Sequence, residues 1–217
     1  MRPKISALIF DIGNVLLPHD YARAKQRLRS EQNKETVPDA EKLIAATCIE
    51  YESGRINRAE FLSIVKNIYA YRDSDESFIK IWCEIFEENI PLHLQIPKLA
   101  ATCPLYLLSN IGCIHREFIH NRYPVFTHFT AGIYSYEVGF MKPHRRIYEI
   151  AIERFNLIPE DTLFIDDLSA NVEGARAAGF QAFTYDWRRH SLFEEALSSY
   201  QLVPPSEPPK NRFASQK

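Results

Sequence analysis

The sequence predicts an α/β protein built on a doubly wound parallel sheet, with a block of helices inserted early in the chain. Short, continuous apolar runs recur along the sequence, which is the pattern of parallel strands that are covered on both faces. Helical patterns separate most of these runs, as in alternating α/β folds. One long polar segment near the start has helical periodicity and contains no convincing strand.

Five apolar runs are predicted to form the strands of the sheet. They are residues 7–10, 105–108, 129–132, 163–165 and 182–185. Two of the helices between them are well marked. In the segment 143–155, Ile147, Ala151 and Phe155 fall on one helical face. The segment 170–178 stops at Gly179, a residue that suits the left-handed end of a helix.

The segment from about residue 21 to about residue 91 breaks the alternation. Its helical patterns cover residues 22–31, 40–52, 58–70 and 77–88. We therefore expect a helical cap over residues 18–91, and an α/β core over residues 1–17 and 92–200. Because this cap leaves from the carboxyl end of the first strand, we expect it to lie above that edge of the sheet. The proline-rich residues 201–217 are expected to form a flexible tail.

Composition narrows the class of protein. The chain has 217 residues, 46% of them hydrophobic, which is enough for a full core. Its 28 acidic and 26 basic side chains leave no basic surplus for nucleic acid or an anionic membrane. The apolar runs are too short to cross a bilayer, and no secretory signal is evident. The four cysteines form no CxxC pair, so we expect reduced thiols in a cytoplasmic protein.

Polar side chains stand where predicted strands end. Asp11 ends the first strand, Ser109 and Asn110 end the second, and Asp166 and Asp167 end the fourth. A lysine, Lys142, lies just before the predicted helix 143–155. Each of these residues alone could be an ordinary turn or capping residue. Together they would gather at the carboxyl edge of one parallel sheet, where ligands bind in open α/β folds.

Such a cluster is suited to phosphate chemistry. Carboxylates such as Asp11 and Asp166 offer the hard oxygen ligands that Mg²⁺ prefers. Lys142 would supply positive charge to phosphoryl oxygens, and the Ser109 hydroxyl could donate a hydrogen bond to them. A carboxylate can also attack phosphorus and form an aspartyl-phosphate, provided that metal and lysine neutralise the repulsion between the two anions.

The four motifs, in this order, resemble those of the haloacid dehalogenase superfamily of hydrolases, from about residue 5 to about residue 185. They are Phe10 to Val15, Leu107 to Asn110, Glu137 to Pro143, and Phe164 to Asp167. The helical segment resembles the small helical cap of one subfamily. Within it, residues 51–56 resemble a cap segment of phosphatases that act on glucose 1-phosphate and related compounds.

The resemblance implies a role for each site residue. Asp11 would be the nucleophile and a metal ligand, with the Gly13 carbonyl and Asp166 completing the Mg²⁺ site. Asp167 would act behind these ligands or orient Lys142. Ser109 and Asn110 would hold the phosphoryl oxygens, and Lys142 would neutralise the nucleophile and the phosphate. The expected activity is Mg²⁺-dependent hydrolysis of a small phosphorylated metabolite, such as a sugar phosphate, as a phosphoric monoester hydrolase.

Position 13 departs from the family pattern, because phosphatases of this superfamily usually carry a second aspartate there. That aspartate protonates the leaving group and then activates water. General acid–base catalysis contributes about 10²–10⁴-fold, so its loss favours substrates with good leaving groups. His19, Asp20 and Glu52 are candidate replacements, against the alternative that His19 and Asp20 only form a hinge.

Two other functions remain open at this point. The chain could be a non-catalytic binding or regulatory protein, because Gly13 lacks the acid. It could also be a dehalogenase, which needs neither metal nor proton donor, although Asp166 and Asp167 argue against that function. Three further expectations concern side-chain burial. His115 and His120 are expected at the surface, and Tyr51, Tyr69 and Tyr71 are expected in the cap core rather than in a substrate pocket.

Overall fold

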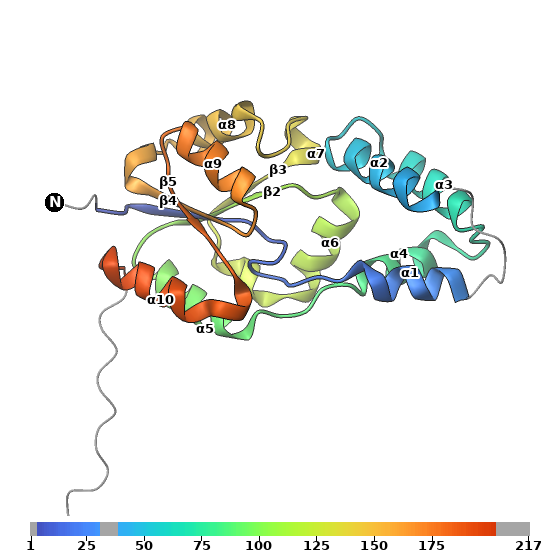
Figure 1. The fold of residues 1–217 in the computed structure, drawn as a ribbon, viewed down its shortest axis with the longest axis horizontal. Helices are drawn as coiled ribbons and strands as arrows, with labels where there is room; N and C mark the ends of the chain where they lie inside the picture. Colours follow the sequence, from blue (N-terminus) through green and yellow to red (C-terminus); the bar gives the residue numbers. More distant parts are fainter. Residues whose placement is uncertain (1–3, 31–38, 203–217) are drawn as a thin grey trace, which may run out of the picture.

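The computed structural model describes residues 4–30 and 39–202, and its centre is a five-stranded parallel sheet (Figure 1). The strand order is β3-β2-β1-β4-β5. The strands are β1 (Ala7–Phe10), β2 (Leu105–Ser109), β3 (Ala131–Tyr134), β4 (Thr162–Asp166) and β5 (Gln181–Thr184). The predicted doubly wound α/β fold is therefore confirmed.

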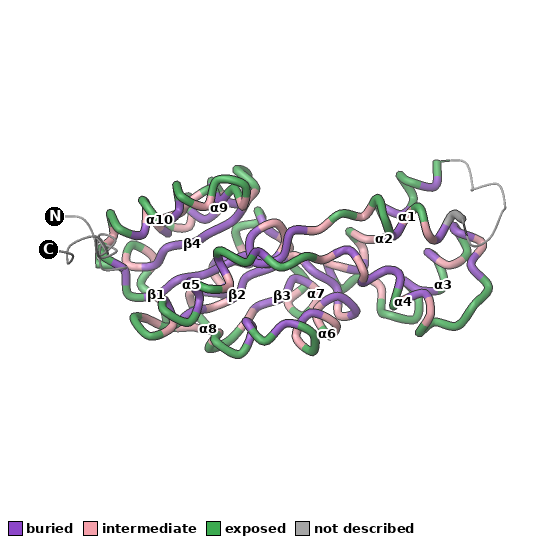
Figure 2. The backbone as a smooth tube through the Cα atoms, turned by 90° about the horizontal axis from the view of Figure 1, so that it is seen from below, coloured by how far each residue is buried: buried purple, intermediate pink, exposed green. Residues whose placement is uncertain are grey.

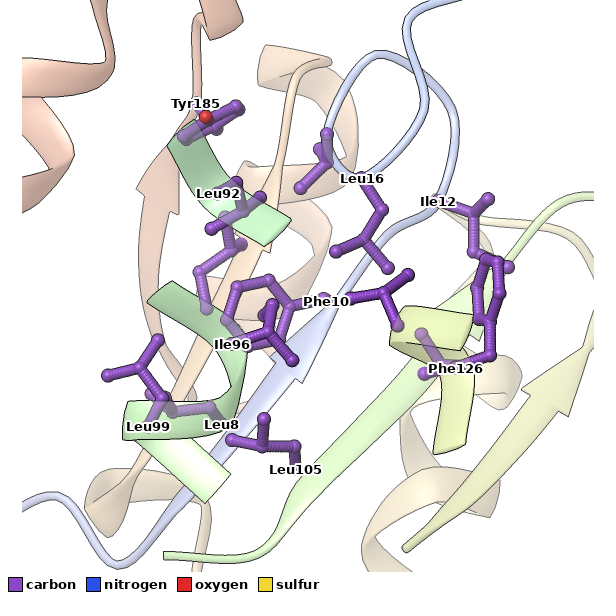
Figure 3. Close-up of a cluster of buried hydrophobic side chains, with 14 of the residues drawn as sticks. Leu8, Phe10, Ile12, Leu16, Leu92, Ile96, Leu99, Leu105, Phe126 and Tyr185 are labelled. Carbon is purple, nitrogen blue, oxygen red and sulfur yellow. The ribbon is translucent and has the colours of Figure 1, made fainter. Parts of the chain in front are cut away.

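Helices cover both faces of the sheet (Figure 1). On one face, α8 (Arg145–Phe155) and α9 (Ser169–Ala177) pack on a cluster that includes Ile9, Leu108 and Phe164. On the other face, α5 (Ile90–Ala100) and α10 (His190–Ser199) pack on Leu8, Phe10 and their neighbours (Figure 3). Successive residues of β1 thus enter opposite cores, which is why the whole strand is apolar.

Four helices form the insertion between β1 and β2. They are α1 (Tyr21–Ser30), α2 (Ala40–Glu52), α3 (Arg58–Ile68) and α4 (Asp75–Cys83). We call residues 21–83 the helical insertion. It extends from one end of the sheet layer (Figures 1 and 2). Its helices pack around a hydrophobic cluster that includes Phe61, Phe78 and Trp82. Tyr51, Tyr69 and Tyr71 belong to that cluster, as expected.

The insertion also shares its core with the sheet domain. Helix α6 (Cys113–Arg122), which follows β2, contributes Ile114 to the same cluster. His115 lies beneath the insertion, with its ring stacked on Trp82 at 6.0 Å and its Nε2 3.1 Å from the Trp82 carbonyl oxygen. The prediction that His115 is a surface residue is therefore wrong, because α6 faces the insertion rather than solvent. His120 is half-buried and hydrogen-bonds Tyr134.

Some boundaries differ from the prediction. Strand β3 begins two residues late, because the 3₁₀ helix η1 (Pro124–His128) carries Phe129 into the core before pairing starts. Helix α4 begins at Asp75, where the Ser74 side chain caps it, and ends at Cys83. Helix α5 was not predicted at all: Pro91 suits its first turn, but Pro97 in its interior conceals the pattern.

The remaining expectations concern the tail, the thiols and the membrane. Only Gln201 and Leu202 of the predicted tail are described, and Leu202 packs in the core; residues 203–217 lie outside the described part of the chain. All four cysteines are free thiols. Within residues 4–30 and 39–202, no helix has the length and apolar character that a membrane span needs.

Candidate active site

The strand register brings the predicted acidic residues together. Phe10 of β1 pairs with Ile165 of β4, so Asp11 and Asp166 leave the sheet side by side. The Asp11 main-chain N–H donates to the Ile165 carbonyl at 2.9 Å, which continues the ladder past the end of β1. One oxygen each from Asp11, Asp166 and Asp167 lie within 4.8 Å of one another. Three neighbouring carboxylates of this kind can hold a hard divalent cation.

Lys142 is buried among these carboxylates. Its Nζ lies 2.9 Å from Asp11 Oδ1 and 2.6 Å from Asp166 Oδ2, and it donates to the Leu108 carbonyl at 2.8 Å. Burial alone would lower the pKa of Lys142, but the charges of Asp11 and Asp166 outweigh it and raise that pKa. The site therefore keeps a fixed positive charge next to Asp11.

Asp11 has an unusual environment for a carboxylate. Burial raises its pKa to about 6, and the charge of Asp166 adds to this effect. Lys142 and a hydrogen bond from the Ser109 hydroxyl oppose the shift. Ser109 is buried at the end of β2, as the sequence predicts for a residue at the site. A carboxylate held in this way is poorly solvated, which favours its use as a nucleophile once a cation is near.

Asp166 and Asp167 have different surroundings. Both Asp166 oxygens accept hydrogen bonds from Asn171 Nδ2, and Oδ1 also accepts from the Leu168 N–H at 2.9 Å. Asp167 Oδ2 accepts from Asn14 Nδ2 at 3.2 Å. Asp166, and not Asp167, therefore orients the Lys142 ammonium. Asp167 keeps more of its carboxylate free for a ligand.

Asn110 also differs from expectation. Its side-chain amide donates to the Lys142 carbonyl at 2.9 Å, and its Oδ1 accepts from the Lys142 N–H at 2.8 Å. Both polar groups of this side chain are thus used to position Lys142, and they are not directed at a substrate. The asparagine partners Asn14 and Asn171 were not assigned roles from the sequence. Their proximity to Asp11 and Asp166 along the chain was the available signal.

The three candidate replacements for the missing acid lie in different places. Glu52, at the end of α2, lies close enough to Asp11 for the two carboxylates to repel each other. Burial, together with this repulsion, raises the Glu52 pKa to about 7. Asp20 is exposed and accepts a hydrogen bond from the Ala22 N–H. His19 lies directly beside Gly13, since a Cβ at position 13 would be 3.0 Å from His19 Cε1.

A cavity of about 490 Å³ opens beside these residues. Asn14, His19 and Asp167 line it from the site, and Trp187 and Arg188 line it from the 3₁₀ helix η3 (Trp187–Arg189) that follows β5. A second cavity of about 370 Å³ shares Asn14, His19, Trp187 and Arg188 and reaches both connections to the helical insertion. The arrangement leaves room for a small polar molecule next to Asp167.

Comparison with known families and proteins agrees with this geometry. A family model described as haloacid dehalogenase-like hydrolase matches residues 5–179. A D-ribitol-5-phosphate phosphatase of Bacteroides thetaiotaomicron is 26% identical over 201 residues, which cover 85% of this chain and 96% of that protein. A phosphorylated carbohydrates phosphatase of Thermotoga maritima is 24% identical and covers 82% of this chain and 83% of its own length.

The same fold occurs in a solved structure. A haloacid dehalogenase family enzyme from Bacteroides thetaiotaomicron, in complex with magnesium and inorganic phosphate, superposes with a TM-score of 0.72. The two sequences are 28% identical, and the match covers 83% of this chain and 93% of that structure.

Proposed function

The chain belongs to the haloacid dehalogenase-like hydrolases, and from this premise we propose that it is a Mg²⁺-dependent phosphatase of small phosphorylated carbohydrates or polyols. One observation carries the proposal: oxygens of Asp11, Asp166 and Asp167 converge within 4.8 Å of one another, and the ammonium of Lys142 lies against Asp11 and Asp166. A relative that covers most of the chain is a D-ribitol-5-phosphate phosphatase, which supports the substrate class.

The donor set fits magnesium. Asp11, Asp166, Asp167 and the Gly13 carbonyl would hold the ion, all through oxygen, and the solved relative binds magnesium with phosphate. When bound, the ion would neutralise phosphoryl charge and bring the substrate to Asp11. Because Asp167 is less committed to protein hydrogen bonds than Asp166, we propose it as the more direct ligand of the two.

The protein side chains would carry the chemistry as follows. Asp11 would attack phosphorus, and the bond to the leaving oxygen would break. The electron pair of that bond would stay on the leaving oxygen, which would take a proton from water, and an aspartyl-phosphate would remain. Lys142 and the Ser109 hydroxyl would stabilise negative charge on the phosphoryl oxygens. The Asn110 side chain would act indirectly, because its two hydrogen bonds to the Lys142 main chain position that residue. Water would then hydrolyse the aspartyl-phosphate and restore Asp11.

A substrate panel tests the proposal. Purified protein with Mg²⁺ should release phosphate from D-ribitol 5-phosphate, from several sugar phosphates or from p-nitrophenyl phosphate. Asp11→Asn is the matched inactive variant and should lose that activity. If no member of the panel is hydrolysed, we would abandon the proposal. A binding protein would then be favoured if beryllium fluoride still bound in place of the phosphoryl group.

A further inference from the structure

Gly13 leaves room for a neighbouring side chain at the position where this family usually carries an acid. A Cβ at position 13 would lie 3.0 Å from His19 Cε1 and 3.3 Å from His19 Nδ1. These distances are tighter than ordinary contacts, so the imidazole fills the space into which a side chain at position 13 would project. The ring occurs there because the chain turns back after β1, with the Asn14 N–H donating to the Leu17 carbonyl at 3.0 Å.

The imidazole is held firmly on its outer side. The main-chain N–H of His19 donates to Asn14 Oδ1 at 3.4 Å, and the main chain of His19 forms an antiparallel bridge with Phe86. Its ring meets Tyr21 edge-on, with centroids 5.6 Å apart, and Phe86 at 6.1 Å. These contacts come from both connections between the sheet and the helical insertion. The ring is therefore fixed by packing, as a catalytic group must be.

One ring nitrogen has no assignment in the folded protein. His19 Nδ1 is buried and makes no hydrogen bond of normal geometry among the described residues, although the ring lies close to the Leu17 carbonyl. A buried nitrogen without a partner destabilises the fold, so such atoms in a native protein call for an explanation. A partner that arrives during the reaction would explain it. The same ring lines both cavities, one of which Asp167 also lines, and it is close enough to Asp11 for the two groups to interact electrostatically.

We propose that His19 is the general base that Gly13 lacks, and that its imidazole activates the water that hydrolyses the aspartyl-phosphate of Asp11. This assignment deepens the function proposed above and rests on it. The ring nitrogen takes a proton from water as the water oxygen bonds to phosphorus. The bond between phosphorus and the Asp11 oxygen breaks, and its electron pair returns to the Asp11 carboxylate. Inorganic phosphate leaves, and the imidazolium gives its proton to solvent.

The neutral form of the ring is the one that this role needs. With p-nitrophenyl phosphate the role is confined to the second half of the reaction, because p-nitrophenolate needs no proton to leave. His19 and an aspartate at position 13 would then be alternative solutions that compete for the same space.

Burst kinetics with p-nitrophenyl phosphate and Mg²⁺ test the assignment. In His19→Asn, the first equivalent of p-nitrophenol should still be released rapidly, and steady-state turnover should fall by about 10²–10⁴-fold. Acid quenching should show aspartyl-phosphate accumulating on Asp11. His128→Asn is the matched control, since His128 is exposed on η1, and it should behave as the wild type. His19→Gln repeats the test should the asparagine variant misfold.

A swap of residues separates catalysis from packing. Gly13→Asp alone should gain little, because the His19 ring crowds the new side chain. His19→Ala with Gly13→Asp should recover steady-state turnover at least about tenfold over His19→Ala, since a general base has been returned to the site. Unchanged turnover in His19→Asn, loss of the burst together with turnover, or no recovery in the double variant would overturn the assignment. A wild type without any burst or turnover would instead remove the proposed phosphatase function.

Discussion

The ammonium nitrogen of Lys142 lies 2.6 Å from Oδ2 of Asp166, and both side chains are removed from solvent. The pair joins the loop before α8 to the end of β4, and Asp11 is the third member of the group. Breaking a buried pair by removing one charge costs far more than breaking an exposed pair. A substitution of Lys142 or Asp166 is therefore expected to change both the stability of the fold and the proposed catalysis.

Asp166→Asn should destabilise the protein by about 1.5–3 kcal/mol, because it removes a charged hydrogen-bond partner of the buried Lys142, while Asp11 stays paired with it. The free energy of unfolding from urea titration at neutral pH measures the effect. Glu153→Gln is the matched control, since it breaks an exposed ion pair with Arg146 at 2.9 Å and should cost no more than about 1 kcal/mol. Equal losses in the two variants would contradict the account of the buried pair.

Asp11 should make the folded protein less stable as the pH rises, which is the opposite of the usual effect of a carboxylate. Its pKa is raised in the folded state, from 3.8 to about 6, so folding disfavours the ionised form. Below about pH 4 the group is protonated in both states and carries no penalty; the penalty grows as pH rises through about 6. Without metal, Asp11→Asn should gain about 1–3 kcal/mol relative to the wild type between about pH 4 and pH 7. A gap that narrows over this range would contradict the assignment.

Metal dependence should concentrate on Asp167. Chelation should abolish activity and added Mg²⁺ should restore it, because Asp11 cannot approach a phosphate dianion without neutralisation. Asp167→Asn should raise the Mg²⁺ concentration for half-maximal activity by about 10–100-fold. The Mg²⁺-induced rise in Tm gives a second readout, independent of turnover. Asp73→Asn, at an exposed position of the helical insertion, is the control and should change neither value.

The helical insertion closes on the sheet domain at Gly54. A Cβ there would lie 2.4 Å from the Tyr136 carbonyl oxygen, and the residue has a φ of 72°. Gly54→Ala should therefore push the insertion away from α7 (Ser135–Val138). We expect it to raise KM by a larger factor than the control variant does. Gly139→Ala is a matched control, because its φ of 75° carries the same backbone strain with no neighbour within 4 Å. Equal KM effects would contradict this reading.

Much of the fold was predictable, because a buried parallel strand needs a continuous apolar run. Strand β1 has the predicted bounds, and Asp11, Ser109, Lys142 and Asp166 lie together where strand order requires. The burial of His115 was not predictable from α6 alone, since it depends on the insertion folding over that helix. The roles of Asn110 and Asp166 follow from hydrogen bonds across the sheet, which no local pattern encodes. The domain boundaries, the tail and the cytoplasmic location remain predictions.

The proposed mechanism depends above all on the phosphorylation of Asp11 during turnover. Protein mixed with a phosphate ester labelled at phosphorus and Mg²⁺, then quenched in acid within one turnover, should carry the label on the peptide that contains Asp11. The label should decay on the timescale of turnover and should be absent from Asp11→Asn, which should lose activity by about 10⁴-fold or more. Hydrolysis of the same ester by Asp11→Asn at the wild-type rate, or turnover of the wild type with the label on another residue, would contradict that mechanism.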